Sequence, residues 1–135
     1  MTIRIIDASV AIKWFVKQEE GADRALCLLD EIRVSVDAFA VPELFFDEML
    51  HVLCKILPTE ALVQSYMEAL QDLGLHRLGN GRQTIATAIR LAKRHHLSGY
   101  DAVYAANAQL VQGVWITADA EAHGKIAPLK ISCLL

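Results

Sequence analysis

The segments IRIIDAS at residues 3–9 and VWITAD at residues 114–119 decide the fold of this chain. Each begins with a short apolar run typical of a buried strand, and each run leads into an aspartate, Asp7 or Asp119. Both aspartates are therefore expected just past the carboxyl end of a strand. That edge is where open α/β sheets bind their ligands. The two segments predict a site at the place where two neighbouring strands end.

Strand and helix signals alternate along the rest of the chain. Strands separated by helices favour a parallel sheet that is covered on both faces. We predict a three-layer α/β/α fold with a mainly parallel five-stranded sheet in the order 3-2-1-4-5, because right-handed crossovers then bring Asp7 beside Asp119. The expected strands cover residues 2–7, part of 34–41, 75–78, 114–117 and 129–134. The expected helices follow Asp7 and Asp119 and cover about 21–33, 42–57, 59–73, 82–96 and 100–112.

Several boundaries of these elements have a specific signal. Pro42 is expected at the first position of a helix, where its missing N–H costs nothing. Thr59 is expected to cap the next helix, and Gly74 is expected to end it. Ser98 to Asp101 match the capping-box pattern S-x-x-D.

The composition predicts one folded domain over residues 1–135. Hydrophobic residues make up 54% of the chain and the formal net charge is −3, so a basic nucleic-acid coat protein is excluded. An enzyme that meets phosphates through bound metal is not excluded. The chain has no signal-peptide pattern at its start and no window apolar enough to span a membrane, so no membrane partner is expected.

The three cysteines, Cys27, Cys54 and Cys133, lie far apart and lack a metal-binding spacing. We expect them to be buried as small apolar residues in a reducing compartment. Together with the absent leader, this predicts a cytoplasmic protein.

Two further acids, Glu48 and Asp101, lie on predicted helices that can close over the edge carrying Asp7 and Asp119. Four carboxylates in one pocket repel each other and stay ionised together only if cations neutralise them. Hard, oxygen-preferring Mg²⁺ or Mn²⁺ meets this need best. Glu48 stands out because it shares a helical row with Leu44 and Val52, where an unpaired carboxylate is costly.

Each acid also has a purely structural interpretation. Asp7 and Asp119 can cap the helices that follow them, and Asp101 fits the capping box. Glu48 can reach out to water from an edge position. Glu43 is a weaker candidate than Glu48, because an acid in a first helical turn is favoured by the helix dipole alone.

Three supporting residues lie close to the acids in sequence. Ser9 and Thr117 can orient a carboxylate or a bound water, or can simply make local turn bonds. Lys125 can meet a substrate phosphate or can be solvated. Asp47 lies on a row with His51 that is expected to be exposed.

Motifs of other enzyme classes are missing. The chain has no H-E-x-x-H, G-x-S-x-G, G-x-G-x-x-G or Walker loop, which argues against a zinc protease, a serine hydrolase and a dinucleotide or ATP enzyme. A phosphoacceptor signalling domain needs paired acids after the first strand, and Asp7 is followed by Ala8. A phosphatase of the Asp-x-Asp kind fails in the same way at Ser9.

The order of the acidic motifs resembles the PIN-domain ribonuclease family, and in particular the toxins of VapBC toxin–antitoxin systems. The match covers nearly the whole chain. Its opening strand and first acid are similar to residues 5–9 (IIDAS), and its Pro-led helix with the second acid resembles residues 42–53 (PELFFDEMLHVL). Its third and fourth acids resemble residues 100–104 (YDAVY) and 117–119 (TAD).

The resemblance implies a function and a set of site residues. It implies an Mg²⁺- or Mn²⁺-dependent endoribonuclease that leaves 5′-phosphate and 3′-hydroxyl ends, with RNA as substrate, an antitoxin protein as partner and a homodimeric assembly. The alternative is a non-catalytic PIN fold that serves as a binding module. The catalytic and metal-binding residues would be Asp7, Glu48, Asp101 and Asp119.

Two positions depart from the family pattern. His51 stands where many relatives carry Asn, and this change is expected to alter packing or metal affinity near Glu48. Asn107 stands where a larger apolar residue is common, and this change is expected to alter a subunit surface.

Overall fold

The computed structural model describes residues 1–135 and contains one five-stranded sheet in the order β3-β2-β1-β4-β5. All four strand pairs are parallel, so the predicted topology is confirmed and the sheet is wholly parallel. The strands are β1 (Arg4–Ile6), β2 (Phe39–Pro42), β3 (His76–Leu78), β4 (Val114–Thr117) and β5 (Ser132–Leu134). The helices are α1 (Ala8–Phe15), α2 (Ala22–Val34), α3 (Leu44–Ile56), α4 (Glu60–Asp72), α5 (Arg82–His95), α6 (Gly99–Leu110) and α7 (Ala120–Ile126).

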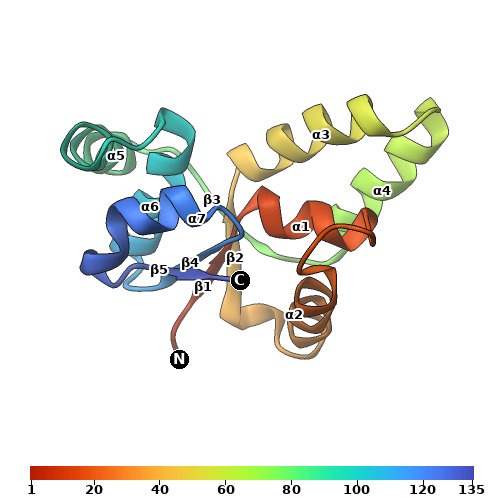
Figure 1. The fold of residues 1–135 in the computed structure, drawn as a ribbon, viewed down its shortest axis with the longest axis horizontal. Coiled ribbons are helices and arrows are strands. Elements are labelled where there is room, and N and C mark those ends of the chain that lie inside the picture. Colours follow the sequence, from red (N-terminus) through yellow and green to blue (C-terminus); the bar gives the residue numbers. More distant parts are fainter.

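The helices cover both faces of the sheet. Figure 1 shows α1 to α4 on one side of the strands and α5, α6 and α7 on the other. Direct packing agrees with this view, because α1 and α3 contact β4 and β2, while α6 contacts β1, β2 and β4. The arrangement follows from right-handed crossovers, since the chain moves outward from β1 to β3 on one face and returns to β4 on the other.

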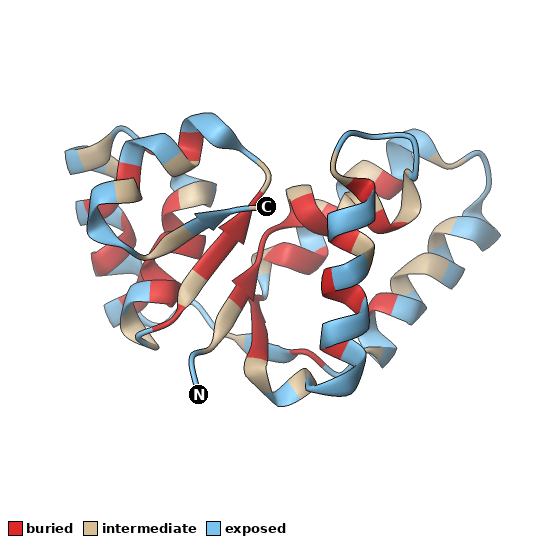
Figure 2. Ribbon diagram, turned by 60° about the horizontal axis from the view of Figure 1, so that its bottom comes forward, coloured by how far each residue is buried: buried red, intermediate tan, exposed pale blue.

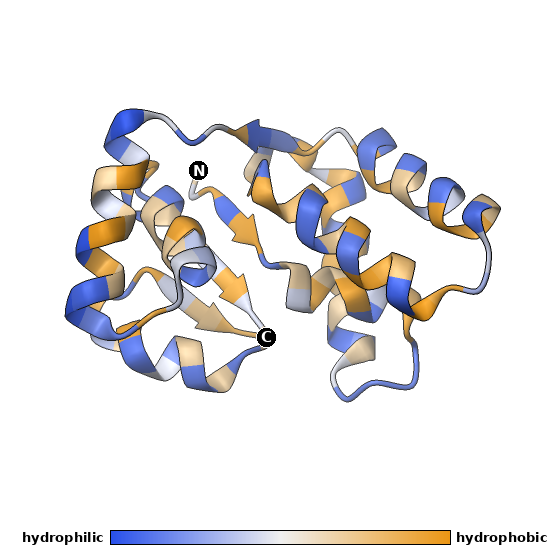
Figure 3. Cartoon of the chain, turned by 90° about the horizontal axis from the view of Figure 1, so that it is seen from above, coloured by the Kyte–Doolittle hydropathy of each residue, from blue (hydrophilic) through white to orange (hydrophobic).

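The strands form the centre of the core. One cluster of 32 buried hydrophobic residues runs through both helical layers, and Figure 2 shows β1, β2 and β4 as the most deeply buried strands. Figure 3 shows these strands as hydrophobic and the edge strand β3 as hydrophilic. A parallel sheet buried on both faces requires near-continuous apolar strands, and only an edge strand is free of that demand.

The pairing of β1 with β4 fixes the two strand ends that matter for the site. Ile6 lies opposite Ile116, and the backbone N–H of Asp7 donates to the Ile116 carbonyl at 3.0 Å. At the other end of β4, a Cβ on Gly113 would clash with the Ile3 carbonyl oxygen, and the adjacent Val114 N–H donates to that same oxygen. Glycine at position 113 therefore permits the close approach of the segments that lead into β1 and β4.

The predicted capping signals are confirmed. The Thr59 hydroxyl accepts a hydrogen bond from the Leu62 N–H at the start of α4. The Ser98 hydroxyl accepts one from the Asp101 N–H at the start of α6. Gly74 follows α4 with a positive φ of 75°, a conformation that glycine adopts without strain.

The prediction for Pro42 was wrong. Pro42 is the last residue of β2 and lies opposite Leu78 of β3, while α3 begins two residues later at Leu44. Pairing of β2 with β1 covers only Phe39 and Ala40, so the strand has a single neighbour at Pro42. Proline is tolerated at such a strand end because its missing N–H breaks no ladder on the open side.

The predictions for the cysteines and for Asn107 were also wrong. Cys27, Cys54 and Cys133 are free and exposed, because each lies on the outer side of its helix or edge strand. Asn107 is only 3% exposed, and its side chain donates to the Val103 carbonyl at 3.0 Å. The bond to the preceding helical turn satisfies the buried amide, so Asn107 is a core residue of α6 and not a surface one.

None of the helices is both long enough and apolar enough to cross a bilayer.

Candidate functional site

Asp7 lies at the end of β1 and is the most deeply buried of the four acids, at 7% exposure. Its Oδ2 accepts a hydrogen bond from the Ser9 N–H at 2.9 Å, which caps α1, and its Oδ1 accepts one from Trp115 Nε1 at 2.9 Å. Burial raises the pKa of Asp7 above its usual range, although the bonds from Ser9 and Trp115 partly lower it. The predicted cap is real, and it fixes the carboxylate in one orientation.

Ser9 and Thr117 form the link between β1 and the end of β4. Their hydroxyl oxygens lie 3.4 Å apart. The Ser9 hydroxyl accepts from the Ala118 N–H at 3.0 Å, and the Thr117 hydroxyl accepts from the Asp119 N–H at 3.1 Å. The two predicted supporting residues therefore hold the TAD segment against Asp7, and in this structure they act on the backbone.

Asp119 is exposed and lies two residues past β4. Its Oδ1 accepts from the Ala122 N–H at 3.1 Å and caps α7. Its charge is one of the causes that raise the pKa of Asp7. The structural and the functional interpretation of Asp119 are thus compatible, since one carboxylate oxygen makes the cap and the other is free of it.

Asp101 is half-buried in the first turn of α6. Burial raises its pKa, the charges of Asp7 and Asp119 raise it further, and Ser98 and Lys125 act in the opposite direction. Lys125 Nζ donates to the His96 carbonyl at 3.0 Å and lies 3.6 Å from Glu121 Oε1. These contacts keep the ammonium group of Lys125 within electrostatic range of Asp101.

Glu48 lies on α3, within electrostatic range of Asp7 and Asp101. Burial is the main cause that raises its pKa from 4.5 to about 7, the charges of Asp7 and Asp101 add to this rise, and the nearby Tyr104 hydroxyl opposes it. Glu48 Oε1 and the Tyr104 hydroxyl are both buried without a hydrogen-bond partner. An unpaired buried carboxylate oxygen is costly, so this atom is available for a ligand.

The structure therefore brings all four predicted acids into one electrostatically coupled group. The charges of Asp7 and Asp101 raise the pKa of Glu48. The charge of Asp119 raises the pKa of both Asp7 and Asp101, and Asp7 also acts on Asp101. Glu43 lies outside this group. It is exposed and holds Arg77 through two hydrogen bonds of 3.0 Å.

The chemistry of the four acids fits a hydrated divalent ion. No three His, Cys, Asp or Glu side chains are gathered closely enough to hold a metal by themselves. Mg²⁺ in proteins commonly keeps several waters and binds through one or two carboxylates, so it does not need such a cage. The all-oxygen donor set, the mutual repulsion and the unpaired Glu48 oxygen all favour a cation here.

Other basic residues of the chain have a structural partner or lie at an exposed helix end. Lys13 Nζ pairs with Glu19 Oε2 at 3.2 Å. Lys93 and Arg94 are exposed in the last turn of α5, as expected for a solvated cluster at a helix C-terminus.

A hollow of about 460 Å³ adjoins Glu48, and we call it the α3 hollow. It lies between one side of α3 and the first turn of α6. The residues that line it are Leu44, Asp47, Glu48, His51, Val52 and Tyr100.

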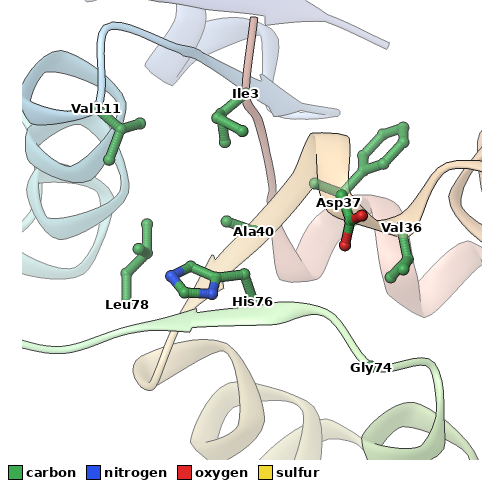
Figure 4. Close-up of a pocket in the computed structure, with 9 residues that line it drawn as sticks. Ile3, Val36, Asp37, Ala40, Gly74, His76, Leu78 and Val111 are labelled. Carbon is green, nitrogen blue, oxygen red and sulfur yellow. The ribbon is translucent and has the colours of Figure 1, made fainter. Parts of the chain in front are cut away.

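A second hollow, of about 400 Å³, contains none of the four acids (Figure 4). It lies near the starts of β1 and β2, toward the sheet edge opposite the acids. Its polar side chains are His76 and Asp37, and Figure 4 shows the His76 ring beside Ala40 and Leu78. Of these two hollows, the α3 hollow is the one lined by a member of the acidic group, Glu48.

Sequence reasoning missed Trp115 and Tyr104. The two rings stack with centroids 5.8 Å apart, and they reach Asp7 and Glu48 respectively. Both residues were visible in the motifs, Trp115 inside the strand before TAD and Tyr104 three residues after Asp101. Their polar atoms were the missing signal, because a buried Trp or Tyr usually needs a hydrogen-bond partner.

The raised pKa values predict how the metal-free protein responds to pH. The folded state holds the Glu48 proton up to about pH 7, against an ordinary pKa of 4.5 in the unfolded chain. Protonated Glu48 therefore contributes to the free energy of unfolding fully below pH 4.5, and this contribution is lost as pH rises through about 7. In EDTA, we expect Glu48→Gln to raise Tm by about 3 °C at pH 8 and by almost nothing at pH 5.

Thermal melts of both proteins across this range measure the difference. Glu43→Gln, which alters a surface carboxylate paired with Arg77, is the matched control and should show no such pH dependence. Equal gains at pH 5 and pH 8 would contradict the assignment to Glu48 ionisation.

Parallel strands ending in coupled carboxylates define a class of α/β proteins with an acidic site at the sheet edge. The family comparison places the chain within that class: it matches the PIN domain over residues 4–127 and belongs to this family. No curated protein matches the chain in sequence.

Solved structures share the fold at low identity. A toxin–antitoxin complex from Klebsiella pneumoniae is 18% identical, with a TM-score of 0.70 and coverage of 96% of this chain and 95% of that one. VapBC2 from Rickettsia felis, bound to a DNA fragment from its promoter, is 12% identical with a TM-score of 0.70, covering 99% of both chains. FitAcB from Neisseria gonorrhoeae is 16% identical with a TM-score of 0.75, covering 98% and 96%.

Proposed function

We propose that this protein is a metal-dependent endoribonuclease and the toxin of a type II toxin–antitoxin system. The observation that carries the proposal is the coupled group of Asp7, Glu48, Asp101 and Asp119 at the carboxyl edge of the sheet, with an unpaired buried oxygen on Glu48. Membership of the PIN domain family supports the nuclease class. The similar fold of toxin–antitoxin complexes supports the biological setting.

Mg²⁺ or Mn²⁺ would be held by Asp7, Asp101 and Asp119, directly or through water. When bound, the ion lowers the pKa of the attacking water and stabilises charge on the leaving oxygen. Asp7 keeps a fixed orientation because Ser9 and Trp115 donate to its two oxygens. This preorganisation avoids the cost of arranging a carboxylate during the reaction.

Glu48 is the group best suited to accept a proton from the attacking water. One of its buried carboxylate oxygens has no hydrogen-bond partner and is therefore free to accept that proton. As water attacks phosphorus and gives its proton to Glu48, the bond to the 3′-oxygen breaks and the leaving oxygen takes a proton from solvent, which gives a 5′-phosphate and a 3′-hydroxyl. Lys125 would contact a non-bridging phosphate oxygen from its position near Asp101.

A cleavage assay tests the proposal. Purified protein is incubated with a structured RNA that contains single-stranded loops, in Mn²⁺, in Mg²⁺ and in EDTA. We expect cuts in the unpaired regions with either metal and none in EDTA, because proteins reach RNA most easily where its bases are unpaired. We also expect either metal, at millimolar levels, to raise Tm by mass action.

The competing function is a non-catalytic binding module. It predicts a metal-induced rise in Tm with no cleavage of any RNA. Failure of both the thermal shift and the cleavage would contradict the assignment of the four acids as a metal site.

We also propose that the protein forms a homodimer in addition to binding an antitoxin. Several large hydrophobic side chains are exposed, and two of them, Ile85 at 41% and Ile89 at 60%, lie one turn apart on α5. Others, including Leu50, Ile56 and Leu62, are exposed on α3 and α4. Exposed apolar patches commonly mark protein interaction surfaces.

Sedimentation velocity at tens of micromolar is expected to show a dimer. Ile89→Asp should dissociate it, because burying an unpaired charge in an interface is costly. Leu62→Asp, at an exposed position of α4, is the matched comparison. A monomeric wild-type protein at this concentration would contradict the dimer.

A further inference from the structure

We infer that the α3 hollow is a base-binding subsite, which holds the nucleobase next to the scissile phosphate and prefers guanine. The inference rests on the proposed ribonuclease function and extends it to the recognition of RNA. It starts from the position of the hollow. Glu48 belongs both to the acidic group and to the hollow's wall, and Tyr100 directly precedes Asp101. A nucleotide with its phosphate at the acids would therefore have its base within reach of the hollow.

The size and the walls of the hollow suit a planar aromatic ligand. Its volume of about 460 Å³ falls in the range of small-molecule sites. Leu44 and Val52 provide apolar walls from α3, and Tyr100 provides a ring that is 66% exposed. An exposed aromatic ring beside apolar walls is the kind of platform on which unpaired bases stack.

The charge of the hollow selects a base and not a phosphate. Asp47 and Glu48 contribute two carboxylates, and no lysine or arginine lines the hollow. A phosphate would be repelled there, whereas hydrogen-bond donors on a base edge would be accepted. Guanine carries adjacent N–H and NH₂ donors on its Watson–Crick edge, and these can meet the two oxygens of one carboxylate.

Asp47 is the specificity-determining residue in this arrangement. It is exposed and lies one turn before His51 on the same side of α3, so its carboxylate is free to accept hydrogen bonds from a base. Uracil, which has carbonyl oxygens flanking a single N–H, would place acceptors against a carboxylate. Guanine should therefore bind best and uracil worst.

The experiment measures RNA binding separately from cleavage. Fluorescently labelled single-stranded oligoribonucleotides of about ten residues carry one guanosine, one uridine or one abasic site in an otherwise constant sequence. Anisotropy with Mg²⁺ is recorded in an Asp101→Asn background, in which cutting is expected to be too slow to interfere. The variants are Tyr100→Ala, Tyr100→Phe and Asp47→Asn, with Glu43→Gln as the control, since Glu43 is an exposed acid outside the hollow.

We expect Tyr100→Ala to weaken binding of the guanosine oligonucleotide by about tenfold and Tyr100→Phe to restore it, because stacking needs the ring and not the hydroxyl. Asp47→Asn should remove the preference for guanosine over uridine. Tyr100→Ala and Asp47→Asn should both leave binding of the abasic oligonucleotide unchanged. Tyr100 is exposed, so these substitutions leave the core intact.

Two results would overturn the subsite. One is an equal loss of affinity for the intact and the abasic oligonucleotide in Tyr100→Ala, which would mean that Tyr100 contacts the RNA backbone and not the base. The other is no change in RNA binding in any variant, which would leave the hollow to a protein partner. Base-selective binding by a protein that cleaves nothing would keep the subsite and reject only the nuclease, so the two failures are distinguishable.

Discussion

Asp101→Asn is expected to lower RNA cleavage by about 10²–10³-fold while leaving the fold unchanged. Asp101 is half-buried and is coupled to Asp7 and Asp119, so loss of its charge removes one ligand of the proposed ion. Metal ions typically contribute several kcal/mol of transition-state stabilisation, which corresponds to this range of rates. Single-turnover cleavage of the loop-containing RNA in Mn²⁺, together with metal titration calorimetry, measures both effects.

Asp101 is a better test position than Asp7. Both oxygens of Asp7 accept hydrogen bonds, and an asparagine amide there would face Trp115 Nε1 or the Ser9 N–H with a donor. Asp7→Asn would therefore disturb folding as well as chemistry. Glu43→Gln is the control for Asp101→Asn and should retain full activity. Cleavage that persists unchanged in Asp101→Asn would indicate a contaminating nuclease or a wrong site.

Trp115→Ala is expected to destabilise the protein by about 3–5 kcal/mol, a large share of the stability of an ordinary domain. Trp115 is fully buried on β4, stacks on Tyr104 and donates to Asp7. The substitution leaves a cavity in the sheet layer and removes a donor from a buried carboxylate. Urea unfolding followed by circular dichroism gives the change in free energy.

Tyr104→Phe provides the opposite case within the same stack. Its hydroxyl makes no hydrogen bond of good geometry, although it lies near Glu48 and lowers the pKa of that carboxyl, so removing it loses at most a weak interaction and keeps the ring contact. We expect a change in stability between zero and about 1 kcal/mol in the stabilising direction. A loss as large as that of Trp115→Ala would show that the hydroxyl has a structural partner in solution.

The strand order and the caps were predictable because they depend on local patterns and on chain handedness. The alternation of strands and helices, with right-handed crossovers, leaves few topologies, and the order 3-2-1-4-5 follows. Thr59 and Ser98 were predictable because a cap needs only a hydroxyl at the right offset. Each cap joins residues three positions apart in the sequence.

The remaining features depend on contacts between distant segments. Pro42 carries the same signal at a strand end as at a helix start, and only the pairing with β3 decides between them. The cysteines have no periodic pattern that distinguishes inner from outer positions. Trp115 and Asp7 lie 108 residues apart, so nothing local predicts that the indole supports the carboxylate.

Gly113 shows that the constraints on this site extend to the far edge of the sheet. Any side chain at this position would collide with the Ile3 carbonyl and push β4 away from β1, the two strands that end at Asp7 and the TAD segment. During divergence, all four acids could remain intact while a single alanine at position 113 spoiled their alignment. Retention of the acids alone is therefore an incomplete criterion for judging whether a homologue of this chain is still active.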